Sequence, residues 1–187
     1  TVWGGLDELS QLSDDRLSML IHPDKAQGND VYLLNATLVY DAYNYDYTLE
    51  MERIKGKLVV LAENLPDNFD MVDIDANNLY GKVNANFEYS DEASVCNKVA
   101  IASTSLIKTA TYMAPSIVTG GTVLDVNFVK ANNGSGNLQL TPDDVKISLE
   151  RNKITMLKYV FNKEEDKFYI YIKVNDNWEV VHGMILD

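Results

Sequence analysis

The sequence predicts an all-β protein, folded as an antiparallel sandwich of two sheets. Eight to ten short runs alternate apolar and polar residues, as strands with one buried face do. Turn residues separate these runs, and helical periodicity is nearly absent after Val31. Short strands at short spacing, without helices between them, are typical of a two-sheet sandwich. We expect residues 1–30 to form an N-terminal arm or lead-in and residues 31–187 to form the sandwich domain.

The composition excludes several classes of partner. The 187 residues are 46% hydrophobic and 10% aromatic, as in a folded domain with a core. Lys and Arg number 16 against 28 Asp and Glu, and the formal net charge of -12 repels phosphate backbones. We therefore expect no nucleic-acid partner. No apolar run approaches the roughly 20 residues that cross a membrane, so we expect no transmembrane span.

A single cysteine, Cys96, excludes an internal disulfide and a multi-cysteine zinc site. We expect its thiol to be a small buried side chain. The chain opens at Thr1 without Met or a signal peptide, which indicates a processed or truncated product.

The first 30 residues predict little regular structure. Leucines at spacings near three between Leu6 and Leu20 fit either a short helix or an extended lead-in. His22, Pro23 and Asp24 match the tripeptide of J-domain co-chaperones, but the helices that this motif needs on either side are missing. We interpret residues 22–30 as a polar turn.

Residues 47–63 form the stretch around which the sandwich is organised. Two sets of alternating apolar residues meet near Arg53, which predicts a long central strand with a bulge there. Gly56 lies between apolar positions, where a strand uses glycine for a bulge or a closely approaching backbone. We expect residues 109–114 and 122–130 to form a hairpin through Gly120 and Gly121. The other predicted strands are residues 31–40, 69–76, 79–89, 95–101, 145–149, 154–161, 168–174 and 178–181, with residues 90–94 as a loop.

Four tyrosines, Tyr40, Tyr43, Tyr45 and Tyr47, fall within eight residues, next to Asp41 and Asp46. A tyrosine ring offers an apolar face with a polar tip, so the cluster fits a ligand surface that stacks sugars. A covered sheet face is the alternative.

The sequence offers no catalytic or metal-binding motif. Neither histidine, His22 or His182, has a nucleophile motif beside it. Asp73, Asp75 and Asn77 imitate the start of a calcium loop, but the glycine and glutamate that an EF-hand needs further along are missing. We expect no enzyme, no cofactor and no metal.

Three stretches carry a family resemblance: residues 49–60 (LEMERIKGKLVV), residues 64–78 (NLPDNFDMVDIDANN) and residues 149–157 (LERNKITML). They resemble the C-terminal domain of the fimbrillin-type pilins and fimbrial anchor proteins of Bacteroidales. Residues 2–5 (VWGG) are similar to the family's lead-in. Arg53 and Arg151 match its recurrent arginines, which we interpret as caps or salt-bridge partners at strand ends.

The resemblance implies a transthyretin-like Greek key on a non-enzymatic surface protein. It implies a fimbrial subunit or anchor at the cell surface, outer membrane or fimbrium, with any lipid anchor outside this chain. Its partners would be other fimbrial subunits or surface ligands, joined by strand addition. The candidate movable pieces are residues 1–20 and 182–187, and the favoured alternative is that each end finishes its own sheet. The alternative function is a monomeric module that binds carbohydrate or peptide through its tyrosines.

Overall fold

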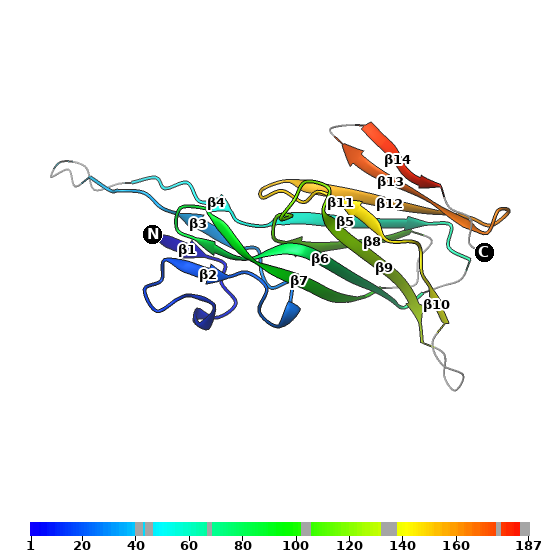
Figure 1. The fold of residues 1–187 in the computed structure, drawn as a ribbon, viewed down its shortest axis with the longest axis horizontal. Helices are drawn as coiled ribbons and strands as arrows, with labels where there is room; N and C mark the ends of the chain where they lie inside the picture. Colours follow the sequence, from blue (N-terminus) through cyan, green and yellow to red (C-terminus); the bar gives the residue numbers. More distant parts are fainter. Residues whose placement is uncertain are drawn as a thin grey trace.

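In the computed structural model two stacked sheets form the body of the molecule, and a small third sheet lies at one end (Figure 1). The structure describes residues 1–39, 43, 47–66, 69–101, 106–131, 138–174 and 177–183. In this part of the chain there is no α-helix, only two short 3-10 turns, η1 (Leu9–Gln11) and η2 (Pro23–Lys25). The prediction of a nearly all-β protein with antiparallel sheets is confirmed. The Greek-key connectivity stays a prediction.

The five-stranded sheet has the order β14-β13-β12-β5-β8. Its strands are β5 (Gly56–Glu63), β8 (Leu106–Met113), β12 (Ile154–Asn162), β13 (Lys167–Val174) and β14 (Asn177–Gly183). Because β5 lies between β8 and β12, the predicted central position of this stretch is correct. The β5–β12 ladder is parallel, whereas we predicted an antiparallel sandwich throughout.

The six-stranded sheet is built on β6 and β9. Its main path is β10-β9-β6-β2, with β11 paired to β9 and β7 paired to β6. Its strands are β2 (Ser18–Leu20), β6 (Met71–Asn84), β7 (Tyr89–Ala100), β9 (Thr122–Lys130), β10 (Leu138–Leu140) and β11 (Val145–Ile147). The small sheet contains β1 (Val2–Gly4), β3 (Tyr32–Leu34) and β4 (Glu52–Arg53).

The core fills the space between the two large sheets with the inward side chains of alternating strands. Phe128, Tyr159 and Phe168 meet there with ring centroids 5.9 to 6.1 Å apart, and all three are fully buried. Met19 and Ile21 of the first 30 residues are also fully buried in this core. The leucine-rich stretch before them is therefore extended around η1 and β2, not helical. The division at residue 30 stays a prediction.

Several predicted boundaries are wrong because alternation shows which face a residue takes but not which strand it pairs with. Of the predicted residues 109–114, those up to Met113 belong to β8 in one sheet, whereas residues 122–130 form β9 in the other, so the two stretches form no hairpin. Residues 69–76 and 79–89 are not two strands, because β6 runs on to Asn84. The ladder with β7 shifts register between Ala76 and Leu79, where Asn78 has φ 62°.

Two further predictions fail in the same region. Residues 90–94 form part of β7 and are not a loop. Cys96 is exposed, because it lies on the outer face of β7 while Val95 points into the core.

The stretch of residues 47–63, predicted as one long strand, is divided between two sheets. β4 belongs to the small sheet, and β5 begins at Gly56 in the five-stranded one.

Candidate functional site

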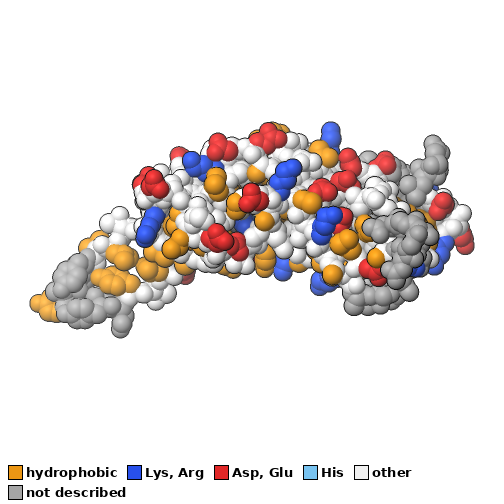
Figure 2. Space-filling view, turned by 90° about the horizontal axis from the view of Figure 1, so that it is seen from below, with side chains coloured by type: hydrophobic (Ala, Val, Ile, Leu, Met, Phe, Trp, Pro, Cys, Tyr) orange, Lys and Arg blue, Asp and Glu red, His pale blue; other side chains and the backbone are white. Residues whose placement is uncertain are grey.

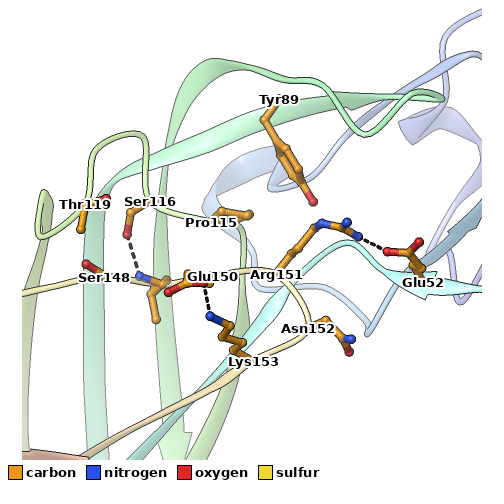
Figure 3. Close-up of a pocket in the computed structure, with 11 residues that line it drawn as sticks. Glu52, Tyr89, Pro115, Ser116, Thr119, Ser148, Glu150, Arg151, Asn152 and Lys153 are labelled. Carbon is orange, nitrogen blue, oxygen red and sulfur yellow. Dashed lines mark hydrogen bonds and ion pairs between the residues drawn. The ribbon is translucent and has the colours of Figure 1, made fainter. Parts of the chain in front are cut away.

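The first candidate site is a hollow of about 590 Å³ at the end of the sandwich from which β4 emerges (Figure 3). Four separate segments supply its walls: β4, the start of β7, the loop after β8 and the connection between β11 and β12. The lining residues are Glu52, Tyr89, Pro115, Ser116, Thr119, Ser148, Leu149, Glu150, Arg151, Asn152 and Lys153.

The charged groups of this hollow pair with each other. Arg151 Nη1 donates to Glu52 Oε2 at 2.5 Å, and its guanidinium lies 4.7 Å from the centre of the Phe87 ring. Lys153 pairs with Glu150 three residues earlier. The prediction that Arg53 and Arg151 are salt-bridge partners is confirmed, since Arg53 Nε also contacts Asp30 at 2.7 Å.

The hydroxyl groups of the hollow are engaged with the backbone as well. Tyr89 Oη donates to the Ile54 carbonyl at 2.6 Å, and burial raises the pKa of Tyr89, so the phenol stays protonated. Ser116 Oγ accepts the N–H of Leu149, and Ser148 Oγ accepts the N–H of Gly120. These groups hold the loops in place, and no nucleophile is paired to a base among the lining residues of the hollow.

The predicted ligand surface lies elsewhere, on the segment that connects β3 to β4. We call the described residues of this segment, 35–39, 43 and 47–51, the tyrosine arm. Figure 1 shows it projecting beyond the end of the sandwich. Tyr43 is 95% exposed and Tyr47 is 43% exposed. Tyr40 and Tyr45 lie outside the described residues, and the ligand surface stays a prediction.

The tyrosine arm also exposes aliphatic side chains. Leu38 is 55% exposed, Val39 75% and Leu49 43%. Figure 2 shows hydrophobic side chains gathered at the end of the molecule where the arm projects, whereas on the body they are interspersed with acidic and basic ones. Tyr47 Oη donates to the Val39 carbonyl at 2.8 Å, which ties the outgoing and returning runs together. Exposed apolar groups at this density mark a contact surface.

A third group of residues, the polar cluster of the buried His22 and Lys55 and the half-buried Gln27, closes part of a sheet edge. The N–H of Ala114 donates to His22 Nε2 at 2.9 Å, so Nδ1 carries the proton and donates to the Ala26 carbonyl at 2.8 Å. Gln27 Oε1 accepts the N–H of Tyr112 at 3.3 Å. The η2 segment thus caps the free edge of β8 at its C-terminal end.

Lys55 holds that segment from the other side. Its ammonium is fully buried and donates to the carbonyls of Gln27 (2.5 Å) and Asn29 (2.9 Å). Burial lowers the pKa of Lys55 to about 8, against the favourable charges of Asp7 and Asp30. Burial, and then the charge of Lys55, lower the pKa of His22 to about 4. Residues 22–30, which were predicted to form a polar turn, are therefore held in place by hydrogen bonds of His22, Gln27 and Lys55. We call this set of hydrogen bonds the lock.

The residues that imitate the start of a calcium loop are Asp73, Asp75 and Asn77. All three lie in β6, where Asp73 pairs with Lys98 at 3.3 Å. Within the described residues, no group of three His, Cys, Asp or Glu is placed to hold a metal ion. Nor does that part of the chain contain a helix long and apolar enough to cross a membrane.

Comparison with known proteins finds likeness in structure alone. No protein-family model matches the sequence, and no curated protein matches it. A crystal structure of a proposed cell adhesion protein from Bacteroides uniformis superposes with a TM-score of 0.56 at 12% identity, covering 88% of this chain and 68% of that one. A proposed adhesin from Bacteroides thetaiotaomicron gives a TM-score of 0.50 at 10% identity, covering 96% and 75%. At such identities the likeness shows a shared fold.

Proposed function

We propose that this protein is a non-enzymatic cell-surface protein, a fimbrial subunit or anchor that acts in adhesion and assembly through strand addition. The observation that carries the proposal is the tyrosine arm, in which every residue from 35 to 39 and from 47 to 50, and Tyr43, is exposed. A soluble domain with no partner rarely displays so much apolar surface on a projecting segment. The arm continues from the paired strands β3 and β4. A strand added by a partner would therefore also find a backbone edge in this pair with which to form hydrogen bonds.

The fold likeness supports the same class of function. Both superposed Bacteroides proteins are described as adhesion proteins, and the resemblance of three sequence stretches points to surface proteins of the same bacterial order. The main hollow adds to this, because ion pairs and backbone hydrogen bonds occupy most of its polar side chains. Outer membrane or fimbrium as the location belongs to the same proposal.

The two chain ends are weaker candidates for exchanged strands than the arm. β1 pairs with β3, β2 pairs with β6 and β14 pairs with β13, so residues near both ends complete sheets of their own chain. Exchange of an end would first require one of these ladders to open.

Size-exclusion chromatography with light scattering tests the proposal. The native chain is compared with a variant in which residues 36–50 are replaced by a short Gly-Ser turn and with a variant lacking residues 184–187. We expect concentration-dependent oligomers from the native chain and monomers from the arm variant. Oligomers lost only on deletion of residues 184–187 would assign the exchange to the C-terminus instead. A native chain that stays monomeric at every concentration would overturn assembly by this protein.

The second candidate function is a carbohydrate-binding module, which the exposure of Tyr43 specifically favours. Exposed tyrosine rings stack on sugar rings. A glycan array probed with the native chain and with Tyr43→Ala tests it. Binding of one glycan class that disappears in the variant would support this function, whereas equal signals from both proteins would reject it.

A further inference from the structure

A second hollow lies between β11 and the β12–β13 pair. It has a volume of about 420 Å³, and its lining includes three lysines, Lys146, Lys153 and Lys173, with one acid, Glu150. We call it the lysine groove. Lys153 pairs with Glu150 inside the groove, but the lysines outnumber the acid by three to one, so the groove has a net positive charge in a chain of net charge -12.

Apolar side chains lie between these lysines. Ile147, Ile154 and Ile172 also line the groove, and Ile154 is 60% exposed although it begins a strand of the core sheet. The groove runs beside β11, which among the described strands pairs with β9 alone. Lys146 and Ile147 of β11 line the groove. An apolar surface with lysines around it and a sheet edge beside it is suited to bind an extended peptide segment that carries acidic and apolar side chains.

The tyrosine arm has the complementary composition. Between Asn35 and Met51 the sequence contains three acids and neither Lys nor Arg. Glu50 belongs to the arm, and Asp41 and Asp46 stand in the sequence between its described residues. Its large exposed hydrophobic side chains are the aromatic Tyr43 and Tyr47 and the aliphatic Leu38, Val39 and Leu49. The volume of the groove lies within the range of about 300–1,000 Å³ that holds ligand groups, so it accommodates a few side chains of the arm rather than the whole segment.

We propose that the tyrosine arm of one copy docks into the lysine groove of the next copy, so that the chain assembles head to tail. The arm points away from β11 and β13 of its own chain, which leaves the groove of another molecule as its target (Figure 1). The arm and the groove are different surfaces, so the contact is heterologous and builds a ring or an open fibre. This inference rests on the proposed function and names the self-association partner.

Complementary variants test the docking. The groove variant carries Lys146→Glu and Ile154→Asp, both at exposed side chains, and the arm variant replaces residues 36–50 by a Gly-Ser turn. We expect each variant alone to be a monomer, with an apparent dissociation constant raised about tenfold or more. An equimolar mixture should form a heterodimer and stop there, because each pair retains one intact arm and one intact groove.

A matched control tests whether the loss of assembly is specific to the groove or follows from any similar change in charge and apolar surface. Lys163→Glu combined with Leu9→Asp makes the same chemical changes at exposed positions outside the groove, and this variant should assemble like the native chain. Near-native circular dichroism and melting temperature will show that each variant is folded. Higher salt should weaken native assembly, because exposed charge pairs are screened.

The outcomes distinguish this inference from the proposed function. If the groove variant assembles like the native chain while the arm variant does not, the arm binds another surface and only the docking site is wrong. If both variants assemble, the arm has no part in self-association. If the native chain itself is monomeric, the proposed assembly fails and the docking fails with it.

Discussion

Two segments without long strands flank β3, and they differ in almost every physical respect. Residues 22–30 precede this strand, and residues 35–51 follow it. The first segment is held by His22 and Lys55, both buried, which place their nitrogen atoms within hydrogen-bond distance of backbone groups. The second exposes every described residue from 35 to 50.

The comparison shows that irregular backbone serves two separate purposes in one small region. In residues 22–30 buried polar atoms find partners within the chain, so this segment contributes to stability and closes the edge of β8. In the tyrosine arm apolar groups remain in water, so we expect its contribution to lie in contacts with other molecules. Substitutions in residues 22–30 should therefore lower stability, whereas substitutions in the tyrosine arm should weaken association.

The largest expected effect is that of His22→Ala. It removes the acceptor of the Ala114 N–H and the donor to the Ala26 carbonyl in a buried site, and it leaves a cavity. We expect the free energy of unfolding to fall by about 3 kcal/mol in urea titrations. Thr37→Ala in the arm is the control, with almost no change. A loss below about 1 kcal/mol for His22→Ala would mean that water replaces the imidazole and that no lock exists.

Acid should weaken the same lock by a comparable amount. The pKa of His22 is about 4 in the folded chain and about 6.5 in the unfolded chain, so between these values the unfolded state binds the extra proton. Stability should therefore fall as the pH drops from about 6.5 to about 4, by up to about 3 kcal/mol from this group. Urea titrations across this range measure it. His22→Gln should have a shallower slope; an equal slope would assign the acid sensitivity to other groups.

Gln27→Ala should have a smaller effect. The Gln27 side chain gives the Tyr112 N–H its acceptor at 3.3 Å, but the strand edge there is partly open to water. We expect a loss of about 1 kcal/mol, measured by thermal or urea unfolding. Gln27→Glu retains an acceptor oxygen and should recover most of that loss. If both variants match the native chain, the cap on β8 depends on His22 alone.

The smallest effect on stability is expected in the tyrosine arm. Tyr43→Ala and Leu38→Ser remove exposed side chains. We therefore expect the free energy of unfolding, measured by thermal unfolding, to change by no more than about 0.5 kcal/mol. The same variants should weaken self-association in sedimentation experiments, because they remove apolar contact area. A large drop in stability would show that the arm packs on its own domain in solution.

The sequence predicts the strands and their faces well, because alternation follows directly from burial of one face. It also predicts the close approach at Gly56, where a Cβ atom would lie 2.4 Å from the Glu150 carbonyl oxygen. Pairing partners are another matter. β8 and β9 follow each other along the chain and carry similar patterns, yet they belong to different sheets.

The sites were predicted least well, because they depend on contacts across long separations. Lys55 stands between Ile54 and Gly56 in a strand-like stretch, where a lysine normally faces solvent. It is buried because the carbonyls of Gln27 and Asn29, far earlier in the chain, approach its ammonium. The hollow around Arg151 likewise joins four segments that no local pattern connects.

The parallel β5–β12 ladder has a consequence for the order of folding. It joins a strand that begins at Gly56 to one that begins at Ile154, with Lys57 opposite Ile154 and Glu63 opposite Val160. A chain that emerges from its N-terminus can pair β5 with β8 early, but the other edge of β5 waits until most of the chain has followed. Such non-local pairing slows folding. Nascent molecules therefore carry an open strand edge in the middle of their future sheet, a period in which they are vulnerable to misassembly with one another.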